Sequence, residues 1–356
     1  MYNFLKRYKS IFLILLLLLT FTTTAVGQQL KVHYIDVGQG DSILIQAPED
    51  KAMLIDGGPR GSGDIVTSYL RDNNVNDLEY LVSTHPHADH VGGLSTVLDN
   101  YEVQKIIDSG KIHTSKTYEN YLKKIDQKGI AYEVGRKGDQ YKLGDTSLQI
   151  LHPDSTDYGL NNCSIVFILK YKGAKFLFTG DIEKHIEDNM VKDNVNINSH
   201  FLKVSHHGSD SSTTKEFLNE VTPQVAVITV GEDNRYGHPN DSTLKRLDNN
   251  DVDIYSTAKN GNIVITTDGQ SYSIKTEYNS KLKVSEEKEE YNQKDPPENK
   301  SDKKERFVGS VNSDKYHWPG CRWTENIEPE NEIWFDSAGE AQDAGYKPCG
   351  TCSPPS

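Results

Sequence analysis

The sequence predicts an α/β fold in which two β-sheets pack face to face and helices cover their outer sides. Three observations lead to this prediction. Short apolar runs alternate with polar segments of helical spacing over residues 30–276, the alternation comes in two successive blocks, and polar side chains follow several apolar runs directly. Two blocks of strands and helices are typical of two packed sheets covered by helices.

The elements of each block follow from its apolar spacing and its turns. In the first block, strands are expected at 31–37, 42–47, 52–55, 80–82 and 104–107, and helices at 64–72, 94–98 and 118–127. In the second block, strands are expected at 147–151, 164–170, 175–179, 201–205 and 224–230, and helices at 182–191, between the last two strands, and at 243–247. A hairpin of residues 262–267 and 271–276 closes the domain.

The first 27 residues have the features of a secretory signal peptide. A basic segment at 6–9 precedes an unbroken apolar run at 11–19, and the small residues 25–27 suit cleavage before Gln28. The run is short for a bilayer span. We therefore expect a secreted protein with no stable membrane span, and the alternative is a membrane anchor formed by an uncleaved N-terminal segment.

The composition predicts a large domain over 28–276, a charged disordered linker over 277–305 and a small module over 306–356. The linker residues cannot bury enough apolar surface to fold, and a module this small needs a metal or a disulfide.

The net charge of −13 argues against a protein that binds nucleic acid nonspecifically. It does not exclude a nucleic-acid substrate, because bound cations invert the local field at a metal site.

A histidine-rich loop follows the predicted strand 80–82. It contains His85, His87, Asp89 and His90 in the pattern H-x-H-x-D-H. Imidazole together with carboxylate suits zinc or manganese, so the loop predicts a metal site at a sheet edge. Further polar residues follow other predicted strands and would reach the same edge: Asp56, Asp181, the pair His206-His207, and His238.

Four segments together resemble a known family. Residues 32–42, 84–90, 203–209 and 236–239 are similar, in the same order, to the soluble hydrolase domain of bacterial competence DNA-uptake channel proteins, which is part of the metallo-β-lactamase superfamily. The resemblance covers about residues 30–276. It implies a four-layer αβ/βα sandwich with one or two divalent metal ions, zinc or manganese, at the sheet edge.

The resemblance also implies roles for individual residues. His85 and His87 would hold a first metal ion, Asp89, His90 and one of His206 and His207 a second, and Asp181 would bridge them. Of the pair, His206 is preferred. Asp89, Lys203 and His238 would be catalytic, and Asn162, Ser164 and Tyr236 would bind substrate. Lys203 could equally be a strand residue that only extends to the solvent.

The sequence departs from the broad superfamily at residues 160–164, where a further histidine is usual and Leu-Asn-Asn-Cys-Ser stands instead. Oxygen ligands suit harder ions, so the departure favours manganese over zinc. His152 could replace the missing ligand, although His152-Pro153 is more typical of a turn.

The C-terminal module carries two close ligand pairs, His317 with Cys321 and Cys349 with Cys352. This spacing predicts a structural zinc site, because a disulfide would leave one cysteine and His317 without a role. Residues 345–352 resemble the zinc-binding domain of the Ada DNA-repair proteins. Since His317 stands where that family has its methyl-accepting cysteine, we expect zinc binding, with DNA contact open, and no methyl transfer.

These observations predict an exported metal-dependent hydrolase, a phosphodiesterase or nuclease that acts on DNA through a metal-activated water. Two alternatives stay open. One is a metallo-hydrolase of a small ester, lactone or phosphodiester, which the acidic net charge favours. The other is a non-catalytic DNA-binding protein in which the zinc module is the working part. The sequence identifies no protein partner.

Overall fold

The computed structural model describes residues 29–279 and, near the C-terminus, 307–310, 313–319, 321, 323–324, 327, 331–335, 337–352 and 354–355. The predicted signal peptide and nearly all of the predicted linker lie outside the described residues. The chain divides into two compact units between Glu286 and Glu287. Each unit is described by itself below.

The first sheet of the large domain has eight strands in the order β15-β14-β1-β2-β3-β4-β5-β6. Their bounds are Leu30–Tyr34 (β1), Ile43–Ala47 (β2), Lys51–Ile55 (β3), Asp77–Ser83 (β4), Glu102–Asp108 (β5), Ala131–Val134 (β6), Ile263–Thr267 (β14) and Tyr272–Thr276 (β15). The closing hairpin β14–β15 pairs with β1. The last strands of the domain therefore complete the sheet that its first strands begin.

The second sheet has seven strands in the order β13-β12-β11-β10-β9-β8-β7. Their bounds are Gln140–Leu143 (β7), Thr146–His152 (β8), Val166–Tyr171 (β9), Ala174–Phe178 (β10), Phe201–Lys203 (β11), Val225–Ile228 (β12) and Asp253–Ser256 (β13). Strands β10 to β13 run parallel, whereas β7 to β10 are joined by antiparallel pairing.

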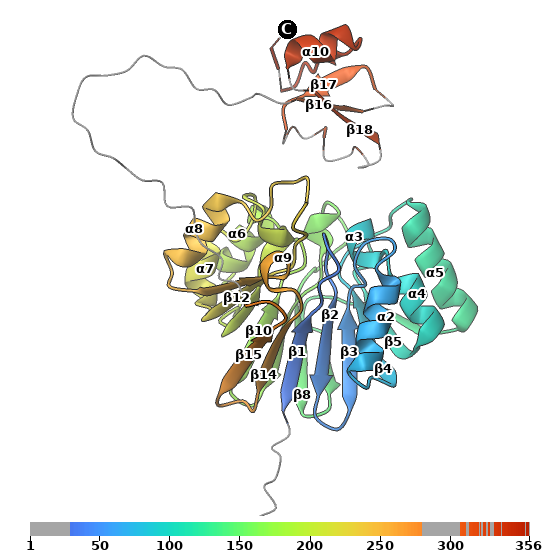
Figure 1. The fold of residues 1–356 in the computed structure, drawn as a ribbon, viewed down its shortest axis with the longest axis vertical. Coiled ribbons are helices and arrows are strands. Elements are labelled where there is room, and N and C mark those ends of the chain that lie inside the picture. The colour runs from blue at the N-terminus through green and yellow to red at the C-terminus, as the bar shows by residue number, and fades with distance from the viewer. Residues whose placement is uncertain are drawn as a thin grey trace, which may run out of the picture. The chain divides into compact units, whose positions relative to one another are not determined.

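The two sheets pack against each other and carry helices on their outer faces (Figure 1). The helices over the first sheet are Gly63–Asp72 (α2), Leu94–Asn100 (α4) and Lys116–Lys128 (α5), and those over the second are Lys184–Lys192 (α6), Lys215–Val221 (α7) and Asp241–Asp248 (α8). Short turns of helix lie at Ala88–Val91 (α3) and Thr257–Asn260 (α9). One apolar cluster fills the space between the sheets and one lies beneath each helical layer. The predicted four-layer sandwich is thus confirmed.

Three strands of the large domain, β6, β7 and β13, were not predicted from the sequence. Each lies at an edge of its sheet. They are four residues long and read Ala-Tyr-Glu-Val, Gln-Tyr-Lys-Leu and Asp-Ile-Tyr-Ser. An edge strand is half exposed and carries polar side chains, so it lacks the continuous apolar run that marked the central strands.

The C-terminal unit is a small four-stranded sheet with one helix. Its strands are Phe307–Ser310 (β16), Lys315–His317 (β17), Glu332–Phe335 (β18) and Lys347–Pro348 (β19), in the order β18-β16-β17-β19, and its helix is Ala338–Asp343 (α10). Four buried side chains make its apolar core, namely Phe307, Tyr316, Phe335 and Ala341. Such a core is too small to stabilise the unit alone.

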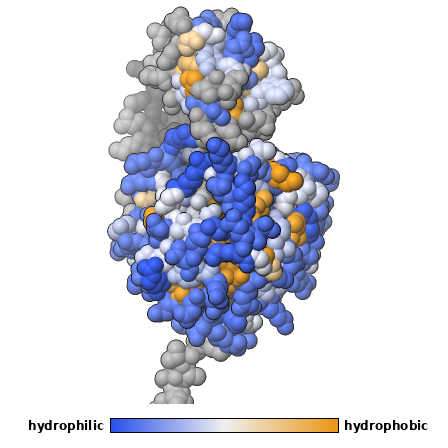
Figure 2. Space-filling view, turned by 90° about the vertical axis from the view of Figure 1, so that its right-hand side faces the viewer, coloured by the Kyte–Doolittle hydropathy of each residue, from blue (hydrophilic) through white to orange (hydrophobic). Residues whose placement is uncertain are grey.

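Within the described residues, no helix has both the length and the apolar character that crossing a membrane requires. On the face of the large domain drawn in Figure 2, hydrophilic side chains predominate and the hydrophobic ones form small, separate patches. That face therefore offers no broad apolar surface for a lipid or a permanent partner.

Candidate metal centre

The ends of parallel strands bring the predicted site residues together. In the first sheet β3 and β4 are parallel, and Asp56 and the histidine loop follow them. In the second sheet β10, β11 and β12 are parallel, and Asp181, the His206-His207 pair and Thr229 follow them. Because the carboxyl ends of parallel strands meet at one edge, two strands of one sheet and three of the other deliver their polar residues to a common site.

Four side chains form the centre of this site. The donor atoms of Asp89, His90, Asp181 and His207 all lie within 4.8 Å of one another. Oδ2 of Asp181 lies 3.1 Å from Nε2 of His90 and 3.3 Å from Nε2 of His207. Oδ2 of Asp89 lies 3.4 Å from the same atom of His207. We call these four residues the acidic cluster.

The far side of each imidazole in the acidic cluster is fixed by a hydrogen bond. Nδ1 of His90 donates to Oδ2 of Asp56 at 2.8 Å, and Nδ1 of His207 donates to the carbonyl of Thr229 at 2.7 Å. Asp56 is itself held by the backbone N–H and the hydroxyl of Thr84. Because each Nδ1 is engaged on the side away from the cluster, Nε2 of both imidazoles faces Asp181 and becomes the ligand atom when a metal ion displaces its proton.

His85 and His87 form a second pair next to the acidic cluster. Nε2 of His85 lies 3.0 Å from Nδ1 of His87 and 3.9 Å from Oδ2 of Asp181. The other nitrogen of His85 lies 3.2 Å from the hydroxyl of Ser164. Asp181 therefore lies near both the histidine pair and the imidazoles of the acidic cluster, where a carboxylate that bridges two cations would stand.

The electrostatics of the site favour bound positive charge. Burial lowers the pKa of His207, but the charges of Asp181, Asp89 and Asp41 outweigh it and raise that pKa to about 10. Burial opposes charge on Asp181, yet His207, His90 and Lys203 hold its pKa well below the usual range. In His85 and His87 burial lowers the pKa, so both are neutral and can act as ligands.

Two buried atoms of the acidic cluster support its fit to a metal ion. Nε2 of His207 and Oδ1 of Asp181 have no hydrogen-bond partner. Leaving buried polar atoms without a partner is costly, and a cation would satisfy both. Two carboxylates with two imidazoles form a donor set that suits zinc, manganese or iron.

The geometry favours His207 as the ligand over His206, the one preferred from the sequence, because His207 rather than His206 joins the acidic cluster. Both residues have positive φ, 48° and 52°. The tight turn they form after β11 directs His207 inward, toward Asp181 and Thr229. It places His206 beside Asn161, whose Nδ2 lies 3.4 Å from Nε2 of His206.

Lys203, predicted to be catalytic, lies beneath the site. Its side chain is 1% exposed, and its ammonium group lies 2.5 Å from Oδ2 of Asp41 and 3.6 Å from Oδ1 of Asp181. It therefore neither extends to the solvent nor reaches a substrate. Gly40 lets the turn that carries Asp41 lie against the histidine loop, because an added Cβ at Gly40 would lie 2.2 Å from the carbonyl oxygen of Asp89. Lys203 is better described as a positioning residue.

Two predicted substrate-binding residues are engaged within the protein. The side-chain amide of Asn162 donates to Oε2 of Glu183 at 3.0 Å and accepts from the backbone N–H of Glu183 at 2.9 Å. Ser164 is fully buried and accepts a bond from the N–H of Asp181 at 3.0 Å. Both residues therefore shape the walls of the site, because their polar groups already have partners.

His152, weighed as a replacement ligand, lies apart from the acidic cluster. Its Nε2 donates to the carbonyl of Asn162 at 2.8 Å. Cys163 is buried, its sulfur contacts the carbonyl of Tyr158, and burial raises the pKa of its thiol. His152 is thus engaged by a backbone carbonyl, and Cys163 is packed inside the large domain.

His238 and Tyr236 lie at the rim of the site. The ring centroids of His238 and His206 are 5.7 Å apart, and the Tyr236 ring stacks on His238 at 5.8 Å. Burial, together with nearby His206 and His207, lowers the pKa of His238 to about 4, so it is neutral at physiological pH. Of the three predicted substrate contacts, Tyr236 is the one that the structure exposes to solvent.

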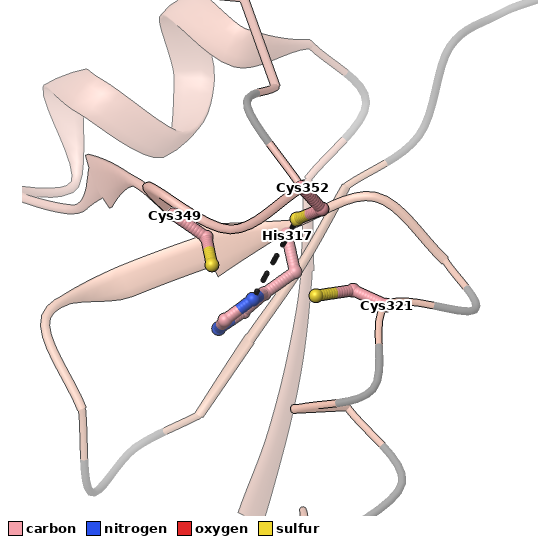
Figure 3. A group of neighbouring side chains, drawn as sticks. All are labelled: His317, Cys321, Cys349 and Cys352. Atoms are coloured by element: carbon pink, nitrogen blue, oxygen red, sulfur yellow. Dashed lines mark hydrogen bonds between the residues drawn. The ribbon is translucent and has the colours of Figure 1, made fainter.

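The C-terminal unit holds the second group of potential ligands. Donor atoms of His317, Cys321, Cys349 and Cys352 lie within 4.8 Å of one another and point toward a common centre (Figure 3). No disulfide joins the cysteines. Because β17 and β19 pair in parallel, their ends bring His317 and Cys349 together. Burial lowers the pKa of His317 and so favours the neutral form that binds metal.

Sequence reasoning missed the residues behind the ligands. Asp56 was expected at the sheet edge but was given no role there, and Asp41 lies in the glycine-rich turn after β1; both are buried and contact His90 or Lys203. The available signal was an acidic residue directly after an apolar run in a glycine-rich turn. Thr229 acts through its backbone carbonyl, so no side-chain motif could have revealed it.

Comparison with known proteins agrees with this architecture. Residues 35–232 match the family described as the metallo-beta-lactamase superfamily. ComE operon protein 3 of Bacillus subtilis is 30% identical over 263 residues, which cover 69% of this chain and 34% of that protein. Competence protein ComA of Neisseria gonorrhoeae is 28% identical over 234 residues, which cover 64% of this chain and 30% of that protein. The chain thus spans about a third of the length of these relatives.

Among solved structures, the metallo-beta-lactamase fold protein YhfI from Bacillus subtilis aligns with a TM-score of 0.46 and 12% identity, covering 67% of this chain and 100% of that chain.

Proposed function

Because the chain belongs to the metallo-β-lactamase superfamily, a family of metal-dependent hydrolases, we propose that its large domain is a phosphodiesterase that cleaves DNA. The observation that carries the proposal is the acidic cluster, in which two carboxylates and two oriented imidazoles converge at the sheet edge and two buried donor atoms lack partners. Relatives named for competence support DNA as the substrate.

The residues divide the chemical work among them. Asp89, His90, Asp181 and His207 would hold one divalent ion, and His85 and His87 with Asp181 a second. Such ions, zinc or manganese, polarise a phosphoryl oxygen and make a water molecule nucleophilic near neutral pH. The carboxylate of Asp89 is 30% exposed and can accept a hydrogen bond from the attacking water. Neutral His238 at the rim can hydrogen-bond to a phosphate or leaving-group oxygen.

Lys203 supports this arrangement from below. Its buried ammonium balances the charge of Asp41 and Asp181, and so holds Asp181 facing the ligand nitrogens. Asp56 and Thr229 fix the imidazoles, and Ser164 fixes both His85 and the backbone of Asp181. Ligands oriented in advance bind metal more tightly than mobile ones.

We further propose that the C-terminal unit binds one structural zinc ion and acts as a DNA-binding or stabilising appendage. The basic and apolar N-terminal segment supports export of the protein, with the large domain outside the cytoplasm. The acidic net charge of −13 favours a second candidate, a hydrolase of a small ester, lactone or phosphodiester.

The test compares substrates and variants side by side. Purified protein with Mn²⁺ or Zn²⁺ is expected to cleave DNA, and a chelator is expected to stop the reaction. Replacing Asp89 by Ala should lower the rate by at least about 100-fold. Asp99→Ala is the matched control, since Asp99 is exposed on α4 and pairs with Lys124.

Two results would overturn the proposal. If Asp89→Ala cleaved DNA as fast as the unaltered protein, the site would be wrong. If the protein hydrolysed a lactone or bis-(p-nitrophenyl) phosphate but not DNA, the second candidate would replace the first. Metal analysis that finds zinc in the C-terminal unit alone would favour a non-catalytic DNA-binding protein.

A further inference from the structure

A row of neighbouring aromatic rings passes through the metal centre. Each ring centroid lies no more than 6.3 Å from the next. In order, the rings are those of His113, His87, His85, His90, His207, His206, His238 and Tyr236. The row begins in the loop of residues 109–115 and ends in the loop of residues 231–239. The proposed chemistry uses neither of its two end residues, His113 and Tyr236.

The Tyr236 end of the row is held in place and open to solvent. The side chain of Asn234 donates to the carbonyls of Gly231 and His238 and accepts from two backbone N–H groups of the same loop. Tyr236 is nevertheless 48% exposed. The guanidinium carbon of Arg235 lies 5.2 Å from the centre of the tyrosine ring. A fixed aromatic ring beside a guanidinium group is a platform for planar ligands.

Buried polar atoms without partners lie between this platform and the acidic cluster. They are Oδ1 of Asn161, Nδ1 of His206 and Nδ1 of His238. The contact of Nδ1 of His206 with a charged group is to Oε1 of Glu183, at 3.6 Å. Because unsatisfied buried polar groups are costly, their grouping beside the metal centre points to a polar ligand that hydrogen-bonds to them.

The opposite end of the row also exposes an apolar side chain. His113 lies beside His87, with ring centroids 6.3 Å apart. Its neighbour Ile112 is 81% exposed, the largest exposed fraction among the large hydrophobic side chains of the described residues. Ile112 thus adjoins the residue at one end of the row and Tyr236 is the residue at the other end, with the acidic cluster between them in the order of contacts.

We propose that this row is a track for one unpaired nucleic-acid strand, with a base against Tyr236 and Arg235 on one side of the scissile phosphate and another against Ile112 on the other. The inference rests on the proposed function and narrows its substrate. Bases in a duplex already stack on their neighbours, so only an unpaired strand can offer its faces to these side chains. The imidazoles of His206 and His238 would donate hydrogen bonds to the phosphate between the two bases.

Binding is measured separately from cleavage. The full chain carrying Asp89→Ala is titrated with metal and a fluorescein-labelled single strand of about 12 nucleotides, and anisotropy reports the affinity. Adding Tyr236→Ala is expected to weaken binding about 10-fold to 100-fold, whereas Tyr236→Phe retains it. Adding Ile112→Ser should weaken binding by a smaller factor. A duplex of the same sequence should bind more weakly than the single strand.

The matched control is Tyr278→Ala, which removes a 58% exposed tyrosine outside the row and should leave the affinity unchanged. Equal affinity of the Tyr236→Ala protein, or tighter binding of the duplex, would overturn the inference. These outcomes are distinct from failure of the proposed function. A protein that cleaves DNA without needing Tyr236 refutes the track alone, and one that binds the strand through Tyr236 without cleaving it refutes the nuclease alone.

Discussion

In the large domain the acidic cluster collects its side chains from the ends of β4, β10 and β11, across residues 89–207, whereas the C-terminal cluster collects four ligands within residues 317–352. Two sheets and three apolar clusters surround the first. The second lies beside one small sheet with a core of four side chains.

The difference concerns whether the fold positions the metal ligands or the metal ligands stabilise the fold. In the large domain the fold positions the ligands, because each imidazole of the acidic cluster is anchored by a residue outside the cluster. In the C-terminal unit we expect the ligands to organise the fold, since the apolar core has only four buried side chains and a metal ion held by three thiolates and one imidazole would supplement it. The first arrangement suits an open, catalytic site and the second a closed, structural one.

Removing metal is the treatment that separates the two regions most strongly. Chelation should unfold the C-terminal unit, because binding of a structural zinc ion contributes on the order of 10 kcal/mol to folding. The large domain should stay folded. Hydrogen–deuterium exchange of the full chain, with and without chelator, is expected to show lost protection in β16–β19 and retained protection in β9 and β10.

The matched pair of variants for this prediction is Cys349→Ser and Cys163→Ala. The first should remove zinc and protection from the C-terminal unit, and the second should leave both in place because Cys163 lies in the large domain. Full protection of β16–β19 in a protein shown to be free of zinc would mean that the small apolar core suffices.

Replacing Lys203 by Met should destabilise the large domain by about 3–5 kcal/mol, because it leaves the Asp41 carboxylate buried without its partner. Urea unfolding, monitored by far-ultraviolet circular dichroism, measures the change. The double variant Lys203→Met, Asp41→Asn should recover part of the loss, since no charge is then left unpaired.

Lys105→Met is the control for Lys203, because Lys105 forms an exposed strand-to-strand pair with Glu133 at 2.8 Å. Such a pair contributes about 1 kcal/mol or less. Equal losses from the two lysine variants would mean that the fold does not depend on the buried pair, and would weaken the contrast with the C-terminal unit.

Replacing Asp56 by Asn should weaken metal binding in the large domain about 10-fold to 100-fold, the usual effect of losing a residue that orients a ligand. Zinc in the C-terminal unit should be unaffected. Competition with a chromophoric chelator measures both sites in one titration, and Asp99→Asn serves as the surface control. If the large-domain affinity did not change, His90 would be oriented by something other than Asp56.

Much of this organisation was predictable from sequence because it is local. Apolar runs predicted the central strands. Residue spacing alone predicted the histidine loop and the two C-terminal ligand pairs as metal sites. The contacts of Asp41 with Lys203 and of Thr229 with His207 join residues far apart in the chain. They depend on strand order, which no local pattern encodes.

The inward direction of His207 shows the same limit at the scale of one residue. Two adjacent histidines are equivalent in a sequence, and only the backbone turn after β11, with positive φ at both, decides which faces Asp181. Asn162 and Ser164 were likewise predicted to bind substrate, but the positions of Glu183 and Asp181 determine that their polar groups are already engaged.

Acid should destabilise the two regions for different reasons. In the large domain the expected effect comes from His33 and is smaller than those of the changes above. Burial, with a contribution from the charge of Lys31, lowers the pKa of His33 to about 4. The folded state therefore disfavours a proton that the unfolded state accepts near the ordinary pKa of about 6.5. The stability that neutral His33 provides is fully present above that value and is lost as the pH falls toward about 4.

In the C-terminal unit acid should act instead by protonating the proposed ligands and so weakening the binding of zinc. His33→Gln isolates the first effect, because it removes the titrating group from β1, away from both clusters. Between about pH 7.5 and about pH 5.5 the unaltered large domain should lose about 1 kcal/mol more stability than the variant. Urea midpoints at the two pH values measure this. If the variant had the same pH dependence as the unaltered protein, the acid sensitivity of the large domain would come from the histidines of its metal centre. Acid would then destabilise both regions in the same way, by protonating metal ligands.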